Sequence, residues 1–298
     1  MEEFLGISFT NRSIVLAHTQ TTDNTVQPVS IQDILYPFPF EFNMILNPDN
    51  TDLLAERIGD YLSNNDLNDK PCAISLPMHL AQVKRAALPS DLDERIVQKH
   101  LQWEVENLNA RALSEYKVVK LDHSFMFGTY QEYVFVLIQK KILESIKQIA
   151  QKASLNVSKV LLDFDTILKY LRRFDLVEAH KNQIVFQIDA FQVNAFIYLN
   201  GLFFDYSLHT LAYETKSENY EAKVLEIIQN ELERIRSVLS QLPQVDQELQ
   251  LFSSRLVTNP MRKLFEKNNL NVQELSVGAQ LKEAGFSSNN IEAYGVTL

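Results

Sequence analysis

The sequence predicts an α/β protein made of two similar halves. Segments with the alternating hydrophobicity of strands precede segments with helical spacing, and the order strands, helix, strands, helix occurs twice in 298 residues. A chain of this length can form two lobes, and 46% hydrophobic with 22% charged residues is a globular composition. Together these observations favour two related α/β units.

The first half is predicted from short apolar runs separated by turns. Residues 4–17 read as two strands with a turn at Thr10 and Asn11, and residues 26–38 continue as a strand of mixed polarity. A helix from Asp52 and a strand at 72–77 follow. The next helix starts at Pro89-Ser90, with Ser90 as N-cap and an apolar face from Leu92 to Leu108. The remaining predicted elements are strands at 116–127 and 132–139, a helix at 142–153, a strand at 157–163 and a short helix at 167–174.

The second half opens with QIDAFQVNAFIYLNG, residues 187–201, which predicts two apolar strands with Asp189 at the end of the first. A third strand at 202–208 completes a meander. A helix at about 219–242 has apolar residues three and four apart, but for fewer than three heptads, so packing on a sheet is favoured over a coiled coil. A strand at 248–252, a helix at 259–268 and a short strand at 271–276 follow.

Charge and composition exclude several classes of function. A net charge of -10 would repel a nucleic-acid backbone on average. The N-terminus lacks the basic and long apolar regions of a signal peptide, and no apolar run approaches the roughly 20 residues that span a bilayer. One cysteine, Cys72, excludes an internal disulfide and fits a reducing compartment. We therefore expect a cytoplasmic protein that neither binds nucleic acid nor inserts directly into a membrane.

The glycine count argues against a nucleotide-driven enzyme. Seven glycines are present, where average usage gives roughly 20, and none are adjacent or in GxG spacing. Loops that cradle phosphates need glycine because the backbone must approach the anion closely. The chain has no P-loop, no GxGxxG and no GxSxG, and its six histidines show no zinc-binding spacing.

Two acidic motifs leave chemistry open. If the preceding strand extends far enough, Asp163 and Asp165 share one strand face and could bind a cation or divide acid and base roles. The favoured interpretation is that both residues end the strand and cap a helix that starts near Thr166. Asp122 and His123 resemble an acid–base couple, but adjacent residues in a strand point to opposite faces.

Two further features have both an ordinary and a functional interpretation. Cys72 precedes an apolar strand and is expected to be a small core residue rather than a nucleophile. The stretch YPFPFEF, residues 36–42, could be an exposed binding edge or a core strand whose pairing is interrupted by proline.

The order of six segments resembles the actin/Hsp70/sugar-kinase ATPase superfamily, and most closely its PilM-type branch of type IV pilus assembly proteins. Three of the segments stand at the family's nucleotide-binding motifs: the phosphate-1 loop at 6–15, the phosphate-2 hairpin at 187–201 and the adenosine motif at 251–265. The other three resemble structural segments of the family: a strand and helix with a Trp-Glu pair at 74–108 (Trp103-Glu104), a strand–helix–strand unit with an acid at 134–168 (Asp163) and a closing strand at 293–298.

The resemblance implies a two-lobed actin-like (ribonuclease H-like) fold, with duplicated mixed β-sheets flanked by helices. It implies a first lobe at 1–172, with an inserted subdomain at about 70–140, and a second lobe at 173–298. Few residues separate Asp189 from the end of the long helix, so the outer subdomain of the second lobe is expected to be reduced.

The departures from the family pattern weigh against ATP hydrolysis. A triphosphate needs Mg²⁺ and carboxylates to neutralise its charge. Here one acid of the usual pair remains, Asp189, which we expect to accept hydrogen bonds from Ser8 or Thr10. In the phosphate-1 loop, Ser8 replaces the family's acid, Thr10 its glycine and Val15 its lysine. Phe191 replaces the glycine of the phosphate-2 hairpin, and Ser253 and Ser254 replace the glycines of the adenosine motif.

Two hypotheses follow from the resemblance. The first is a non-enzymatic scaffold that binds a protein partner near residues 70–140, with the cytoplasmic tail of an inner-membrane protein as a candidate; self-association stays open. The second is a residual Mg-ATP binder or weak ATPase. A sugar or metabolite kinase is disfavoured because no catalytic base is apparent. We assign no catalytic or metal-binding residue; the vestigial cleft is expected at Ser8, Thr10, Asn11, Asp189, Asn194, Ser253 and Ser254.

Overall fold

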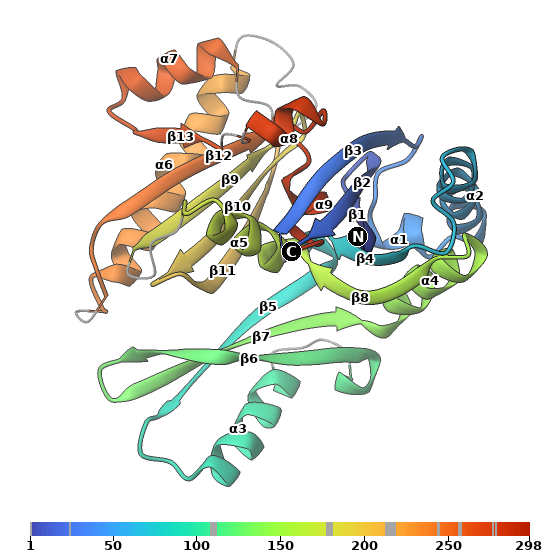
Figure 1. The fold of residues 1–298 in the computed structure, drawn as a ribbon. Coiled ribbons are helices and arrows are strands. Elements are labelled where there is room, and N and C mark those ends of the chain that lie inside the picture. Colours follow the sequence, from blue (N-terminus) through green and yellow to red (C-terminus); the bar gives the residue numbers. More distant parts are fainter. Residues whose placement is uncertain are drawn as a thin grey trace.

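The computed structural model is shown in Figure 1. It describes residues 2–23, 25–107, 112–176, 181–211, 219–242, 245–255, 258–275, 277 and 279–298. Within these ranges, no helix combines the length and the hydrophobicity needed to span a membrane.

The first sheet has five described strands, in the spatial order β3 (Thr25–Leu35), β2 (Ser13–Thr22), β1 (Glu2–Phe9), β4 (Pro71–Leu76) and β8 (Asn156–Leu162). β3, β2 and β1 are antiparallel neighbours, whereas β1, β4 and β8 run parallel. Helices α2 (Pro48–Asn64) and α4 (Lys140–Lys152) pack together against one face (Figure 1). Because both faces of the central strands are covered, β1 and β2 are largely buried and read as apolar runs.

The second sheet repeats this arrangement. Its described strands follow the order β11 (Leu202–Thr210), β10 (Gln192–Leu199), β9 (Asn182–Ile188), β12 (Leu249–Arg255) and β13 (Val272–Glu274). Again, three antiparallel strands are followed by parallel pairs on the other side of the first strand. Helices α6 (Tyr220–Leu239) and α7 (Asn259–Lys267) contact each other. The duplicated mixed sheets predicted from the sequence are therefore confirmed.

Between β4 and α4, the chain forms a third sheet. Its described strands have the order β5 (Ala81–Pro89), β7 (Tyr130–Gln139) and β6 (Tyr116–Phe127), all antiparallel, and α3 (Glu94–Asn107) packs on one face. The opposite face contacts the second sheet, where the rings of Phe125 and Phe204 meet edge to face at 5.0 Å. Single 3-10 turns at Met78–Leu80 and Leu113–Glu115 precede β5 and β6. The lobe boundary at residue 172 stays a prediction.

The helices α5 (Asp163–Arg173) and α9 (Ile291–Gly295) cross between the first two sheets, and α8 (Ala279–Glu283) precedes α9 (Figure 1). The crossing needs glycine. A Cβ atom on Gly295 would lie 2.2 Å from the carbonyl oxygen of Thr166, and one on Gly6 would lie 1.9 Å from that of Ala293. The closing strand expected at 293–298 is wrong, because residues 293–295 belong to α9 and a turn follows them.

Several predicted boundaries are wrong for local reasons. α2 begins at Pro48, because the side chain of Asn47 accepts a hydrogen bond from the Asp49 amide and caps the helix before Asp52. α3 begins at Glu94 rather than at Ser90: strand β5, which the sequence did not predict, runs to Pro89, a turn follows, and Asp93 Oδ1 accepts a hydrogen bond from the Arg95 amide. The end of its expected apolar face, Leu108, lies outside the described residues.

The structure also decides two interpretations that the sequence left open. α5 begins at Asp163, so Asp163 and Asp165 lie in its first turn and not on a shared strand face. Residues 36–41 form neither a strand nor an exposed edge; Tyr36, Phe38 and Phe40 are buried, and the Phe40 ring stacks on that of Phe9 at 4.6 Å. Helix α1 (Phe42–Ile45) follows them.

Two ordinary interpretations are confirmed. Cys72 is buried in the first core, and burial raises the pKa of its thiol to about 12. The apolar side of α6, with Val224, Ile228, Leu232 and Ile235, packs into the core beneath the second sheet.

Candidate functional site

Two hairpin turns face each other where the central strands of the two large sheets end. The β1–β2 turn contributes Thr10 to Ser13, and the β9–β10 turn contributes Asp189 to Phe191. A cavity of about 340 Å³ lies between them and also reaches Arg255 at the end of β12 and Asn289 before α9. We call this cavity the interlobe cleft. It lies at the carboxyl ends of parallel strands, where α/β sheets commonly bind ligands.

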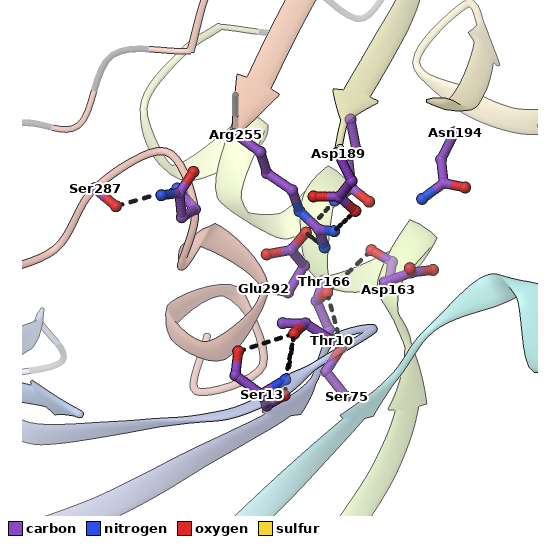
Figure 2. Close-up of polar contacts among 12 residues, drawn as sticks. Thr10, Ser13, Ser75, Asp163, Thr166, Asp189, Asn194, Arg255, Ser287 and Glu292 are labelled. Carbon is purple, nitrogen blue, oxygen red and sulfur yellow. Dashed lines mark hydrogen bonds and ion pairs between the residues drawn. The ribbon is translucent and has the colours of Figure 1, made fainter. Parts of the chain in front are cut away.

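Asp189 is held by an arginine that the sequence did not single out. Arg255 donates from Nη1 to Oδ2 of Asp189 at 2.7 Å and from Nη2 to Oε1 of Glu292 at 3.0 Å (Figure 2). β12 pairs with β9 so that Arg255 stands beside Ile188, which brings its guanidinium within reach of the next residue, Asp189. The expectation that Ser8 or Thr10 would be the partner of this carboxylate is therefore wrong.

The arginine is enclosed and locally strained. Its side chain is 11% exposed, and that of Glu292 is 2% exposed. Burial opposes the charge of Arg255, but the two carboxylates outweigh it and raise the pKa of the guanidinium. The backbone of Arg255 has φ of 69°, a left-handed conformation that a non-glycine residue rarely adopts. Such strain persists only where surrounding contacts hold it in place.

Glu292 connects this ion pair to the centre of the molecule. It lies in α9, which packs against β1, β2 and β4, whereas Gln187 and Arg255 belong to the second sheet. Its Oε1 accepts hydrogen bonds from Gln187 Nε2 and from Arg255 Nη2. The contacts of Arg255 and Gln187 with Glu292 therefore join the two large sheets across the crossing.

A second contact between the two turns lines the interlobe cleft. The guanidinium of Arg12, in the β1–β2 turn, lies 4.4 Å from the ring centroid of Phe191 in the opposite turn. Phe191 thus points into the cleft, where the family pattern has a glycine whose backbone would face phosphate. Its ring lies on the wall of the cleft.

The β1–β2 turn is closed by its own side chains. Thr10 Oγ1 accepts from the Ser13 amide at 3.0 Å and lies 2.9 Å from Ser13 Oγ (Figure 2). The main chain of Asn11 accepts a hydrogen bond from the Phe40 amide. At the position where the family pattern has a glycine, Thr10 therefore stabilises the turn, because its hydroxyl accepts the hydrogen bond of the Ser13 amide.

Asp163 is a buried carboxyl beside this network. It is 4% exposed at the start of α5, and its Oδ1 accepts no hydrogen bond from any described residue. Burial raises its pKa to about 8, and the nearby charge of Glu292 acts in the same direction. Asp163 therefore stays protonated and uncharged at neutral pH, and the ion pairs of Arg255 are those with Asp189 and Glu292.

The other predicted residues lie near the interlobe cleft without lining it. Ser8 is buried in β1, and Asn194 in β10 accepts a hydrogen bond from the Tyr206 hydroxyl at 3.0 Å. Ser253 and Ser254 are buried in β12, and their hydroxyls have no partner among the described residues. Of the seven predicted site residues, the cleft brings together Thr10, Asn11 and Asp189.

The sequence reasoning missed Arg12, Arg255, Asn289 and Glu292. Two of these carried a readable signal: Arg255 ends an otherwise uncharged strand, and Glu292 is a lone acid in an apolar segment. Among the described residues, no group of three or more His, Cys, Asp or Glu side chains is arranged to hold a metal ion.

Duplicated mixed sheets joined by crossing helices define a class, and solved structures of that class match nearly the whole chain. A Bacteroides thetaiotaomicron protein with actin-like ATPase fold and unknown function matches with a TM-score of 0.50 and 9% identity, over 100% of this chain and 96% of that one. The protein therefore has an actin-like ATPase fold, two-lobed and α/β.

Within this class, the resemblance to PilM-type proteins is supported by structure. A chain of the PilM–PilN type IV pilus biogenesis complex matches with a TM-score of 0.69 and 12% identity, over 98% of this chain and 96% of that chain. The cytoplasmic domain of EpsL, an inner membrane component of the type II secretion system of Vibrio cholerae, matches with a TM-score of 0.51 and 10% identity, over 96% and 98%. No protein-family model and no curated protein sequence matches the chain.

Proposed function

We propose that this protein is a non-enzymatic scaffold, a pseudo-ATPase that uses an actin-like fold to bind a protein partner. The observation that carries the proposal is the ion pair of Asp189 with Arg255. The resemblance assigns Asp189 to Mg²⁺ chemistry, yet its carboxylate is already neutralised by a side chain of the same protein. We therefore propose that no cofactor is needed for the cleft to be stable.

The energies involved support a cleft without Mg-ATP. To hold Mg²⁺, directly or through water, Asp189 would have to release Arg255. Removing one partner from a buried ion pair costs about 3–5 kcal/mol, and the 25% exposure of Asp189 favours the lower part of that range. A ligand with a millimolar Kd gains about 4 kcal/mol. The displacement would therefore weaken any Mg-ATP complex by a free energy similar to the whole binding energy of a millimolar ligand.

The nature of the partner is inferred from the similar structures. One is a chain of the PilM–PilN complex, and another is the cytoplasmic domain of an inner membrane component. We propose that the partner is the cytoplasmic segment of a membrane assembly protein, and that this protein is cytoplasmic and reaches the inner membrane through that partner. The net charge of -10 suits a basic segment.

One observation favours a second candidate function. The interlobe cleft keeps a volume of about 340 Å³ with Thr10, Asn11 and Asp189 on its walls. A residual Mg-ATP binder or weak ATPase would use this space, with Asp189 as the acid linked to Mg²⁺.

Thermal unfolding with and without millimolar Mg-ATP separates the two functions. A nucleotide at 100 times its Kd would stabilise the fold by about 2.7 kcal/mol and raise the midpoint by several degrees. The scaffold proposal expects the midpoint to equal that with Mg²⁺ alone. A rise that requires ATP and disappears in Asp189→Asn would establish the nucleotide function instead.

A pull-down from membrane extract tests the partner directly. We expect the immobilised protein to retain a membrane protein with a cytoplasmic segment, identified by mass spectrometry. The Asp189→Ala variant should retain the same protein, because the proposal gives Asp189 no part in binding it. Retention of no membrane protein, or its loss in Asp189→Ala, would contradict the proposal.

A further inference from the structure

A second hollow, of about 350 Å³, lies between the third sheet and the end of α6. Phe127, Tyr130 and Glu132 of the β6–β7 hairpin line one side with Arg85 of β5, and Val238 and Gln241 line the other. We call it the α6 groove. It lies on the sheet face opposite α3 and is separate from the interlobe cleft.

Strand pairing places these side chains on one face. Ala87 is paired with Glu132, and Pro89 is paired with Tyr130. Because Tyr130 and Glu132 are two residues apart in β7, their side chains point to the same face of the sheet. Phe127 is paired with Tyr130 across the hairpin. The sheet therefore presents two aromatic rings and a carboxylate toward α6.

One carboxylate oxygen of Glu132, Oε2, has no hydrogen-bond donor within the described part of the chain. Its side chain is 17% exposed, and the guanidinium Nη1 of Arg85 lies 3.9 Å from its Oε2, beyond hydrogen-bonding distance. The same oxygen is buried and accepts no hydrogen bond from any described residue. Burial raises the pKa of Glu132, although Arg85 opposes this. A carboxylate in this position would gain from a donor that carries positive charge.

Arg85 does not supply that donor because its guanidinium is placed elsewhere. It stacks over the Phe204 ring at 4.6 Å from the centroid and lies 3.9 Å from Asp205 Oδ2. Asp205 is itself bound by Arg234 Nη1 at 2.7 Å.

The charges around the α6 groove do not balance. Two guanidiniums, Arg85 and Arg234, face three carboxylates: Glu132, Asp205 and Glu231. Among these groups the carboxylates outnumber the guanidiniums by one, and His209 contacts Glu231 at 2.7 Å. One additional cation beside Glu132 would restore neutrality.

The geometry points to the α6 groove as a docking site for a lysine or arginine side chain of a protein partner. Glu132 would accept its hydrogen bonds, and the ring of Tyr130, which is 50% exposed, would cover the cation together with Phe127. The inference rests on the proposed function, since it states which chemistry of the partner is recognised.

The test uses arginine amide as the probe and citrulline amide, its neutral analogue, as the matched ligand. Methyl NMR of the full chain follows Val238, which lines the groove. We expect arginine amide to shift the Val238 methyl signals saturably and citrulline amide not to do so. Glu132→Gln should raise the Kd of arginine amide at least about tenfold, as for loss of a charged hydrogen-bond partner, and Tyr130→Ala should raise it about two- to fivefold.

The control variant is Glu144→Gln on α4, which removes the same charge from an exposed position in the first lobe. It should leave the Kd unchanged. Equal Kd values for the wild type and Glu132→Gln, or equal shifts with both amides, would overturn the docking site. If the pull-down still retains a membrane protein, those results leave the scaffold proposal standing. If the pull-down retains no membrane protein but arginine amide still binds, only the scaffold proposal is overturned.

Discussion

The carboxylate of Asp189 and the guanidinium of Arg255 form a 2.7 Å ion pair at the ends of two paired strands. The same guanidinium reaches Glu292 on a helix that packs against the other sheet. A protein side chain thus supplies the positive charge at the place where the family pattern has an acid for Mg²⁺.

Replacing Arg255 should destabilise the protein strongly. Arg255→Ala leaves Glu292 buried without its cation, which costs about 3–5 kcal/mol. Urea unfolding followed by circular dichroism measures the loss. Arg262→Ala is the matched control, because the Arg262–Glu274 pair is exposed and such pairs contribute about 0–1 kcal/mol. Equal losses in both variants would show that the Arg255 network contributes no more than a surface pair.

Asp163 should make stability fall as the pH rises. Its pKa is raised from about 4 in the unfolded chain to about 8, so folding favours the protonated carboxyl. Its stabilising contribution is complete below about pH 4 and is lost through about pH 8, at up to about 1.4 kcal/mol per pH unit.

Asp163→Asn keeps the shape of the side chain but cannot ionise. We expect the variant to match the wild type near pH 4 and to exceed its stability at pH 9, with denaturant unfolding at each pH as the measurement. Because Glu292 and Arg255 remain in both proteins, the difference isolates Asp163. Parallel stability curves over this range would contradict the assignment.

Glu231 should act in the opposite direction, at acidic pH. Burial opposes its ionisation, but hydrogen bonds from His209 and Arg234 outweigh it and lower its pKa to about 2. Folding therefore favours the carboxylate, and its contribution is present above about pH 4 and is lost as the pH falls toward 2.

Glu231→Gln should therefore be less stable than the wild type at pH 7 and nearly equal to it at pH 2. Glu226→Gln, on the exposed side of the same helix, removes an equal charge and should change little at either pH. A constant difference between Glu231→Gln and the wild type across this range would rule out a titrating contribution.

The crossing of α5 and α9 should tolerate no added methyl group. A Cβ at Gly6 or Gly295 would overlap main-chain oxygen atoms, so Gly6→Ala and Gly295→Ala should each cost more than about 2 kcal/mol, in the range of overpacked cores. Gly59→Ala meets nothing within 4 Å in the middle of α2 and should instead stabilise by about 0.5–1 kcal/mol. Thermal unfolding of the three variants measures these changes in stability. A Gly6→Ala protein as stable as the wild type would refute the close contact.

The sequence pattern predicted the fold better than the site. The β9–β10 hairpin was predictable because its strands are short apolar runs, and α6 because its apolar residues recur three and four apart. Strand β5 was missed because its exposed and half-buried residues give no clear alternation. Asp189 was predicted as a site residue, but its partner was not, because pairing with Arg255 depends on the register of β9 with β12. Local periodicity carries no information on that register.

The contacts of α9 also limit how much of the first sheet can finish folding while the chain is being synthesised. The hydroxyl of Tyr294 donates to the carbonyl of Val26, across 268 positions of sequence, and α9 rests on the first strand. While a ribosome makes the chain, strands β1 to β4 are present long before this helix, and the part of their sheet that α9 covers stays open until residues 291–295 emerge. Closing so long a loop is slow, and the exposed apolar face invites aggregation meanwhile. We therefore expect the nascent first sheet to be a preferred client of chaperones.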